Sequence, residues 1–478
     1  MLGGKPLAGQ SIANDILDSL EGSNRPVLVY GDPDIDGLVV VKFYTDFLKE
    51  RGIPYKVRVN RNRQHGWLVP TDMYEGYCIL SGDFQVSKEL FCEVVDSDCV
   101  WLCTDHHADN LEGEDYFSYE GSVMINPLYS NQGDEEHFQS GAGVVLDVLS
   151  HYDPNFLTEE RKALVGLTLL SDVRPIDNNA DAKALLECLY NYPCDEGYFK
   201  RLISSVYSFS KDFGFGRVEL SRNFVDYKLN PFINAMLRFD ALDDAVNFVC
   251  DGICPPHDYL SMHKRLVRDS LGWGLVARFG DLTCKFYRES FVPPQYQTCF
   301  GNFIGYLANK CEGSCLSILL DSDGKVLRAS FRGKTSGAYR TDDIEGLQCL
   351  GHSSAFGVKF DEGVLDTDLI KKFAERVTQI DSAEVEESYS NVEVVYDLKD
   401  WVLHGGMDKA KTNDFTHYNK LKLRYKGNSW RVVKRTPKIA IFDVDGLEVK
   451  SFTGGSPDTR LISPVYDRKA IQFILEGD

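Results

Sequence analysis

The chain has 478 residues and a formal net charge of −20, and these bulk properties exclude several classes of protein. A chain of this length is expected to divide into roughly two to four domains, each with its own apolar core. No apolar run approaches the ~18 residues that cross a bilayer, and the first residues lack the order of a signal peptide, so we expect a cytoplasmic protein without membrane contact. The negative charge argues against non-specific binding to duplex DNA, which depends on Lys and Arg.

Short apolar runs alternate with helix-like stretches over roughly the first 140 residues. We expect strands at residues 27–30, 56–59, 77–80, 100–103 and 123–125, and a helix at 40–49. Strands separated by crossovers predict a parallel sheet covered by helices.

The remaining chain changes pattern twice. Helices are expected at 141–150, 159–170, 180–190 and 259–271, and the last of these connects two parts of the chain. A mixed region follows, with strands near 275–277 and 316–320, a helix starting near Ile304 and a hairpin turn at 321–324. From about residue 390 the alternation has mostly period two. We therefore predict an α/β protein: a parallel-sheet domain with a helical extension (1–255), a connecting helix (256–278), a smaller mixed α/β domain (279–385) and a small β domain (386–478).

Acidic residues and histidines follow the predicted strands, where open α/β sheets bind ligands. These residues are Asp32, Asp34, Asp36, Asp83, Asp105, His106 and His107, and Asp172 follows an apolar helix. A calcium loop is disfavoured, because Phe43 lies where a closing Glu is needed. Any single aspartate at a strand end is more often a helix cap or a solvated turn. Four such clusters together indicate a site for Mn²⁺, or alternatively Mg²⁺, with ligands for two ions that would activate water for phosphodiester hydrolysis.

The 13 cysteines are expected to be reduced thiols, because the chain shows no export signal. Two pairs, Cys250/Cys254 and Cys311/Cys315, have three intervening residues. A zinc knuckle has two intervening residues, and no His-x-His partner lies nearby. We interpret both pairs as buried structural cysteines.

The order Asp-x-Asp-x-Asp-Gly, lone Asp, Asp-His-His, lone Asp resembles the four motifs of the DHH phosphoesterase superfamily. Residues 330–332 and 351–357 resemble the signatures of its accompanying DHHA1 domain, with Leu350 in place of the first glycine. Residues 231–238 and 304–310 are similar to segments of RecJ-type single-strand exonucleases, although Phe232 replaces an arginine and Leu237 a glycine. The patchy similarity between motifs is typical of a divergent relative, and a phage is one candidate source.

The resemblance implies a role for each matching position. Asp34, Asp36, Asp83, His106 and Asp172 would hold the metal ions, Asp32 and Asp105 would orient these ligands, and His107 would contact the scissile phosphate. The residues that would grip the strand are Asn234, Arg238, Ser330, Arg332, Gly351 and His352. The family implies a processive 5′ to 3′ exonuclease on single-stranded DNA. Residue spacing distinguishes neither the polarity nor DNA from RNA.

Two basic stretches are candidate strand-binding surfaces. Arg58, Arg61 and Arg63 precede Trp67, whose ring would stack a base, although a solvated turn has the same composition. Residues 420–426 and 430–435 mix cations with aromatic rings in the C-terminal β domain, and there a lysine-protected edge strand is the alternative. RecJ-type enzymes often carry an oligonucleotide-binding barrel near the C-terminus, which the resemblance suggests for this domain.

Three functions remain open on the sequence. The first is a RecJ-like exonuclease, which we expect to be a monomer that binds single-stranded DNA or RNA, with a single-strand-binding protein or a helicase as a further candidate partner. The second is a nano-RNase or cyclic-dinucleotide phosphodiesterase of the same superfamily. The third is a scaffold that binds nucleic acid without catalysis. Residues 231–238 and the extra C-terminal domain favour the first.

Overall fold

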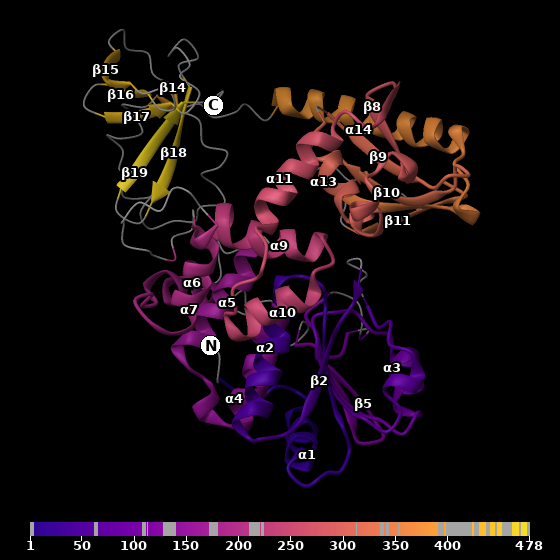
Figure 1. Ribbon diagram of the computed structural model, residues 1–478, viewed down its shortest axis with the longest axis vertical. Coiled ribbons are helices and arrows are strands. Elements are labelled where there is room, and N and C mark those ends of the chain that lie inside the picture. Colours follow the sequence, from indigo (N-terminus) through magenta and orange to yellow (C-terminus); the bar gives the residue numbers. More distant parts are fainter. Residues whose placement is uncertain are drawn as a thin grey trace.

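The computed structural model describes residues 4–61, 66–107, 111, 113–127, 140–171, 180–209, 220, 224–311, 313–334, 339–340, 344–351, 354–390, 396–397, 423–424, 430–435, 440–444, 447–451, 461–467 and 470–475. Figure 1 shows an N-terminal part in indigo to magenta, a second part in orange and a C-terminal sheet in yellow. Within these residues, no helix combines the length and the apolar character that crossing a membrane requires.

The N-terminal part is built on a six-stranded sheet. In sheet order its strands are β2 (Tyr55–Val59), β1 (Val27–Gly31), β3 (Cys78–Gly82), β4 (Val100–Thr104), β6 (Ser122–Ile125) and β5 (Tyr116–Tyr119). The first five strands are parallel, as predicted. The strand β5, which sequence analysis missed, pairs antiparallel with β6 through a tight turn in which Glu120 and Gly121 both have positive φ.

Both faces of this sheet are buried, which explains why its strands are apolar runs rather than alternating ones. Val27 and Val29 face a core formed with α1 (Gln10–Leu20), α2 (Ile35–Glu50) and α4 (Gly141–Tyr152). Leu28 and Tyr30 face an aromatic core that contains Trp101 and is covered by α3 (Lys88–Val95). Successive side chains therefore alternate between two buried layers.

A helical extension packs against the core formed by α1, α2 and α4. Its helices are α5 (Glu159–Ser171), α6 (Ala180–Asn191), α7 (Gly197–Ser208), the π-helical η4 (Val225–Leu229), α9 (Asn230–Arg238) and α10 (Leu242–Asp251). Lys42 of α2 is buried against α10, where its Nζ donates to the carbonyl oxygen of Cys250 at 2.9 Å and lies 2.9 Å from Asp46 Oδ2. These contacts tie the extension to the helix that follows β1.

The predicted connecting helix is α11 (Tyr259–Ser270), which leads to a second six-stranded sheet (Figure 1). In sheet order its strands are β11 (Leu347–Gly351), β12 (Ala355–Phe360), β10 (Val326–Arg332), β9 (Cys315–Leu320), β8 (Leu282–Arg288) and β7 (Leu275–Phe279). Of the pairs between these strands, β8–β9 is parallel and the others are antiparallel, so this part is mixed, as predicted.

Helices cover this second sheet on its two faces. The long helix α14 (Thr367–Ser390) packs Phe373 against Phe331 and Phe356, while α12 (Gln297–Phe300) and α13 (Ile304–Ala308) share a separate cluster with α11. Short helical turns connect several elements: η2 (Thr71–Met73), η3 (Pro154–Phe156), η5 (Glu289–Phe291), η6 (Pro294–Tyr296), η7 (Gly301–Phe303) and η8 (Asp361–Gly363).

The C-terminal part is a β-sheet, as predicted. Its strands are β13 (Tyr396–Asp397), β14 (Leu423–Arg424), β15 (Trp430–Arg435), β16 (Ala440–Val444), β17 (Leu447–Ser451), β18 (Leu461–Asp467) and β19 (Ala470–Leu475). Their order is β13-β14-β18-β19-β17-β16-β15, and among the described strands the two edge strands are not paired with each other. The oligonucleotide-binding barrel suggested by the resemblance stays a prediction. The basic stretch 430–435 coincides with the edge strand β15, whereas most of 420–426 lies outside the described residues.

Two details of the sequence prediction need correction. The helix after β1 begins at Ile35 rather than residue 40, so Asp36 lies in its first turn and not in an open loop. Of the cysteines expected to be buried, Cys250 and Cys315 are, but Cys254 is exposed and Cys311 is half-buried. The boundaries at residues 255 and 385 stay predictions, and the second falls inside α14.

The close approach of β1 to α2 predicts a sensitive position at Gly31. A Cβ atom at Gly31 would lie 2.4 Å from the carbonyl oxygen of Gly37, so we expect Gly31→Ala to lower the free energy of unfolding by about 1–3 kcal/mol. Gly22→Ala is the matched control, because its Cβ would meet nothing within 4 Å and should change stability by less than about 0.5 kcal/mol. Urea unfolding measures both, and equal effects would contradict the prediction.

Candidate functional site

The predicted site residues, both the metal ligand Asp83 and the orienting residues Asp32 and Asp105, converge because their strands are parallel neighbours. Asp32 follows β1, Asp83 follows β3 and Asp105 follows β4, and all three carboxylates are buried at the same edge of the sheet. Parallel strands present their carboxyl ends together, so residues far apart in the sequence meet there. The expected clustering is therefore present for the described members of the set.

Asp36 lies at the centre of this edge and is fully buried. Its carboxylate accepts hydrogen bonds from the backbone N–H groups of Gly141 (2.6 Å) and Ala142 (2.9 Å) and from the Ser140 hydroxyl (3.3 Å). These donors form the N-terminus of α4, whose dipole favours a negative charge. The role of residues 140–142 was not predicted from the sequence, in which a Ser followed by small residues at the start of a helix is the signal for it.

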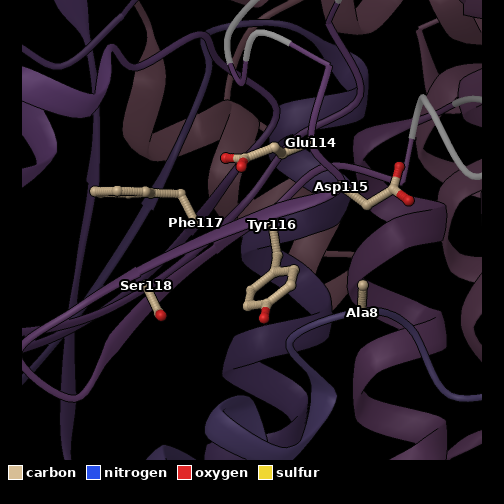
Figure 2. A pocket seen from close by; sticks show the side chains of 6 residues that line it. All are labelled: Ala8, Glu114, Asp115, Tyr116, Phe117 and Ser118. Carbon is tan, nitrogen blue, oxygen red and sulfur yellow. The ribbon is translucent and has the colours of Figure 1, made fainter.

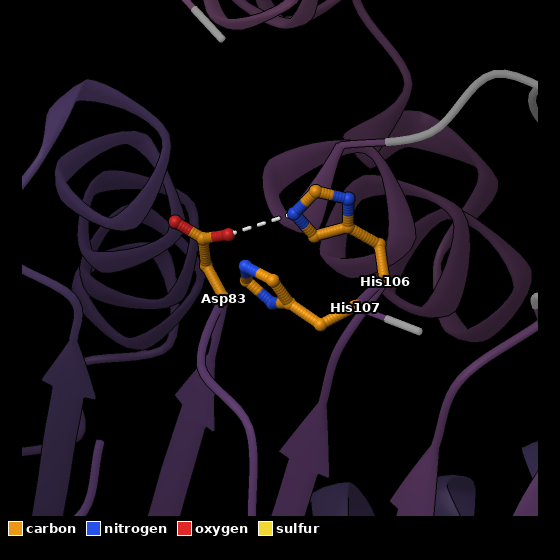
Figure 3. Close-up of side chains that lie close together, drawn as sticks. All are labelled: Asp83, His106 and His107. Carbon is orange, nitrogen blue, oxygen red and sulfur yellow. Dashed lines mark hydrogen bonds and ion pairs between the residues drawn. The ribbon is translucent and has the colours of Figure 1, made fainter. Parts of the chain in front are cut away.

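Asp83 and His106 form the closest pair of candidate ligands. His106 Nε2 lies 3.0 Å from Asp83 Oδ1 and 3.8 Å from Asp36 Oδ2. One ligand atom from each of Asp83, His106 and His107 can be chosen so that all lie within 4.8 Å of one another (Figure 3). Asp83 has φ of 68°, an uncommon left-handed conformation for a non-glycine residue, which the chain adopts as it leaves β3.

His107 differs from His106 in exposure and partner. Its side chain is 45% exposed, and its Nδ1 lies 2.7 Å from Oδ1 of the buried Asp105. Asn126, which follows β6 and was not singled out from the sequence, donates from Nδ2 to the His107 carbonyl oxygen at 2.7 Å. Asp105 therefore holds the ring of His107 and Asn126 holds its backbone, while nearly half of the side chain remains exposed to solvent.

Asp32 and Asp34 of the first acidic motif lie in different environments. Asp34 caps α2, where its Oδ1 accepts from the N–H of Gly37 at 3.0 Å, and it is half-buried. Asp32 is buried, and its backbone packs against Gly37, where a Cβ atom would lie 2.4 Å from the Asp32 nitrogen. This strand–turn–helix arrangement differs from the helix–loop–helix of a calcium hand, as the sequence indicated.

The donor set fits a divalent metal ion. Buried carboxylates at one edge repel one another unless a cation or a proton compensates them. Carboxylate oxygens together with imidazole nitrogens suit Mn²⁺, and Mg²⁺ accepts the oxygens. Asp172, the remaining predicted ligand, lies outside the described residues, as do Arg63 and His352.

Cations from the two parts of the chain meet around Tyr306 of α13. The guanidinium carbon of Arg238 lies 5.1 Å from the centre of the Tyr306 ring, and Lys310 Nζ lies 5.0 Å from it. Burial, together with the charges of Arg238, Lys264 and Lys310, lowers the pKa of His263 to about 3. A chain of net charge −20 thus has a locally basic region here.

The predicted DHHA1 residues Ser330 and Arg332 lie against Gly305 of the same helix α13. Arg332 Nη1 donates to Ser330 Oγ at 2.9 Å, and a Cβ atom on Gly305 would lie 2.8 Å from Arg332 Nη2. Ser330 Oγ donates to the carbonyl oxygen of Phe356, the residue paired with Gly351 in the β11–β12 ladder. The fold therefore brings Ser330, Arg332 and Gly351 together. Asn234 lies one turn before Arg238 on α9.

Arg61 and Trp67, predicted together as a strand-binding surface, lie in different environments. Arg61 is 78% exposed and its Nη1 lies 3.6 Å from Asp240 Oδ2, so the turn after β2 reaches the end of α9. Trp67 is buried and packs against Tyr30 and Trp101, with ring centres 4.9 Å and 4.6 Å apart. The expectation that Trp67 stacks a base is therefore wrong, because its ring belongs to the aromatic core.

The departures from the family pattern have structural explanations. Phe232 and Leu237 are buried in the core of the helical extension, and Phe232 stacks on Phe209. Leu350 is an exposed residue of the extended strand β11 and lacks a positive φ, so its backbone does not require glycine.

A surface hollow of about 420 Å³ lies at the edge strand β5 (Figure 2). Its lining consists of Ala8, Glu114, Asp115, Tyr116, Phe117 and Ser118. The predicted metal and strand-binding residues are not among them, so this hollow is separate from the candidate site.

Removal of the His106 imidazole should abolish tight metal binding. We expect His106→Ala to weaken Mn²⁺ binding by at least about 10- to 100-fold, because two buried carboxylates lose the neutral ligand beside them. His257→Ala is the control, because His257 is exposed and lies outside the site. Isothermal titration calorimetry measures both, and unchanged affinity in His106→Ala would contradict the assignment.

The metal-free protein should lose stability as the pH rises. Burial, followed by the negative charge of Asp34, raises the pKa of Asp36 from 3.8 to about 6. A raised folded-state pKa gives a contribution to stability that is complete below pH 3.8 and is lost as the pH rises through about 6. The loss is on the order of 3 kcal/mol.

Urea unfolding at pH 5 and pH 7 tests this effect by comparing the native chain with Asp36→Asn, which lacks the titrating group. In EDTA, the native chain should lose more stability than the variant between these pH values, and Mn²⁺ should reverse the difference. Equal pH dependence of the two proteins would refute the assignment.

Comparisons with known proteins agree with this geometry at the level of fold. No family model matches the sequence, and no curated protein matches it either. RecJ from Thermus thermophilus in complex with Mn²⁺ has a TM-score of 0.64 and 15% identity, covering 100% of this chain and 72% of that chain; its Mg²⁺ complex has a TM-score of 0.57. An exonuclease RecJ bound to manganese has a TM-score of 0.55 and 17% identity, covering 78% of this chain and 94% of its own.

The DHH domain of a member of the s1p family of ribosomal proteins is also similar, with a TM-score of 0.50 and 15% identity over 77% of this chain and 90% of that chain. The predicted resemblance is thus confirmed in three dimensions: this chain has the fold of RecJ and of DHH-domain proteins, with the α/β architecture expected from its motifs.

Proposed function

We propose that the chain is a metal-dependent phosphoesterase that hydrolyses single-stranded nucleic acid. The observation that carries the proposal is the pairing of Asp83 with His106 beside the buried Asp36 at the carboxyl edge of the parallel sheet. Carboxylates and imidazoles at this position form a divalent metal site, and phosphate esters are substrates suited to such a site. The shared fold with RecJ, whose structures contain Mn²⁺ or Mg²⁺, supports the same chemistry.

The residues that would hold two divalent ions, with Mn²⁺ preferred and Mg²⁺ accepted, are Asp34, Asp36, Asp83, His106 and Asp172. Bound ions supply a hydroxide nucleophile at neutral pH and neutralise charge on the phosphate. The N-terminus of α4 keeps the Asp36 carboxylate in one orientation through its N–H groups. Asp32 and Asp105 are proposed to orient neighbouring groups rather than to bind ions directly.

His107 is the residue proposed to contact the scissile phosphate. Its ring is half exposed, and Asp105 accepts at its Nδ1, so Nε2 is directed away from that carboxylate. A carboxylate partner stabilises the protonated imidazole, which favours donation of a hydrogen bond or a proton to a phosphate oxygen.

The strand is proposed to be held between the two parts of the chain. Arg238 and Lys310 flank Tyr306, and Arg332 lies against Gly305 of the same short helix. Cations in this arrangement bind successive phosphates, so a polyanionic strand fits better than a neutral ester. The other residues proposed for this strand-binding surface are Asn234, Ser330, Gly351 and His352. Arg61 and Arg63 would extend the surface from the turn after β2.

Within this class we propose a RecJ-like 5′ to 3′ exonuclease on single-stranded DNA, acting as a cytoplasmic monomer in repair or recombination. The helical extension and the additional C-terminal sheet favour a long strand over a dinucleotide. A single-strand-binding protein or a helicase would supply such a strand.

Degradation assays with end-labelled substrates test the proposal. With Mn²⁺, the native chain should release mononucleotides from the 5′ end of single-stranded DNA and should leave duplex DNA intact. The variant Asp83→Ala/His106→Ala should lose at least about 10³-fold in rate, because the ligands of the nucleophile are removed. His257→Ala should retain the native rate.

The same assay separates the alternatives. Cleavage of a dinucleotide alone would indicate a nano-RNase or cyclic-dinucleotide phosphodiesterase instead of an exonuclease. Preferential cleavage of RNA would indicate that the substrate is RNA rather than DNA. Release from the 3′ end would reverse the polarity. Strand binding without cleavage of any substrate would indicate a non-catalytic scaffold and would overturn the enzymatic proposal.

A further inference from the structure

Cys311 and Cys315 form a pair of thiols in the second part of the chain, apart from the proposed metal centre. Cys311 follows α13, and its N–H donates to the carbonyl oxygen of Ala308, whereas Cys315 is the first residue of β9. The chain turns sharply between them, with Gly313 in the left-handed region at φ of 77°.

The two sulfur atoms are in direct contact. The Cys315 thiol donates to Cys311 Sγ across 2.6 Å, and both residues are free cysteines in this structure. A disulfide has about 2.05 Å between its sulfurs, so these two atoms, already in contact, need only a short further approach to form one. The spacing alone had suggested only structural cysteines.

The two thiols differ in exposure and acidity. Cys311 is half-buried and Cys315 is buried. The hydrogen bond from Cys315 and the nearby Lys285 ammonium of β8 lower the pKa of Cys311 to about 7, although partial burial opposes them. The contact with Cys311 raises the pKa of Cys315 well above its usual value. Burial raises the pKa of Cys284, on the same strand as Lys285, to about 12.

We propose that Cys311 and Cys315 are a reversible disulfide site, in which the accessible Cys311 reacts first and the buried Cys315 resolves the intermediate. The oxidant is a low-molecular-weight disulfide of the glutathione type. Cys311 thiolate attacks one sulfur of this oxidant, the sulfur–sulfur bond breaks, and one thiolate leaves and takes up a proton from solvent. Cys315 then loses its proton to solvent and attacks Cys311 Sγ, which displaces the second thiolate. Two cysteine thiols are oxidised to one disulfide, and the oxidant is reduced to two thiols.

The position of the pair gives the modification a structural consequence. Cys315 lies opposite Arg332 in the β9–β10 ladder, and Lys310 directly precedes Cys311. A covalent bond between the sulfurs would therefore constrain the backbone beside two cations of the basic region around Tyr306. Formation of the disulfide itself does not depend on the proposed function.

The test uses the full-length native chain in glutathione buffers of increasing oxidised fraction at pH 7.5. Free thiols are then trapped by acid and alkylation, and the peptides are identified by mass spectrometry. We expect one peptide containing residues 311–315 to lose the mass of two hydrogens and to recover it with dithiothreitol. The exposed Cys254 is the internal control and should at most form a mixed disulfide with glutathione.

Variants of Lys285 test whether the reactivity of the Cys311 thiol depends on the nearby positive charge or only on its exposure to solvent. Alkylation of Cys311 at pH 7 should be about two- to threefold slower in Lys285→Met and close to native in Lys285→Arg, which keeps the positive charge. Circular dichroism shows whether each variant is folded.

Two outcomes would overturn the proposal. The first is retention of both thiols at every oxidised fraction of the glutathione buffer, including fully oxidised glutathione. The second is protection of both thiols that a chelator removes, which would make the pair part of a metal site.

Discussion

The arrangement of the candidate site depends on how the buried carboxylate of Asp36 is held. Three donors at the start of α4 bind this carboxylate, so a charge excluded from water is retained on the first turn of α2. The same contacts set the position of α4 beside β3 and β4, because Gly141 lies so close to Asp83 that a Cβ atom there would be 2.5 Å from the Asp83 Cβ. The same residues at the start of α4 therefore hold the Asp36 carboxylate and pack against Asp83. Both contacts require small residues at these positions.

The parallel sheet explains why carboxylates accumulate at a single edge. Each strand enters from the opposite edge and ends beside its neighbour, so Asp83 and His106 become adjacent although they are 23 positions apart in the chain. Burying several carboxylates close together raises the free energy of the folded protein unless a cation compensates their charges. The raised pKa of Asp36 is the response of the metal-free protein to this cost, and metal binding and proton binding are therefore expected to compete.

The charge of the molecule is unevenly distributed in a way that suits a polyanionic ligand. The net charge is −20, yet the charges of Arg238, Lys264 and Lys310 add to the effect of burial in lowering the pKa of His263, so these three cations act on a common region. The short helix α13 brings cations from α9 and from β10 to the same place through Tyr306 and Gly305. An acidic exterior with a local basic region favours a bound single strand over general attachment to duplex DNA.

The sequence alone indicated the fold class, the parallel pairing of the first strands, the connecting helix, and the acids and histidines at strand ends as candidate ligands. These follow from local patterns: apolar runs mark buried strands, and acids at strand ends mark a ligand-binding edge. Only tertiary structure decided which groups contact one another. The cradle of Asp36 at residues 140–142, the support of His107 by Asn126 and the burial of Trp67 in an aromatic core all join residues distant in the chain. Such contacts depend on how helices and strands pack together, which local composition does not encode.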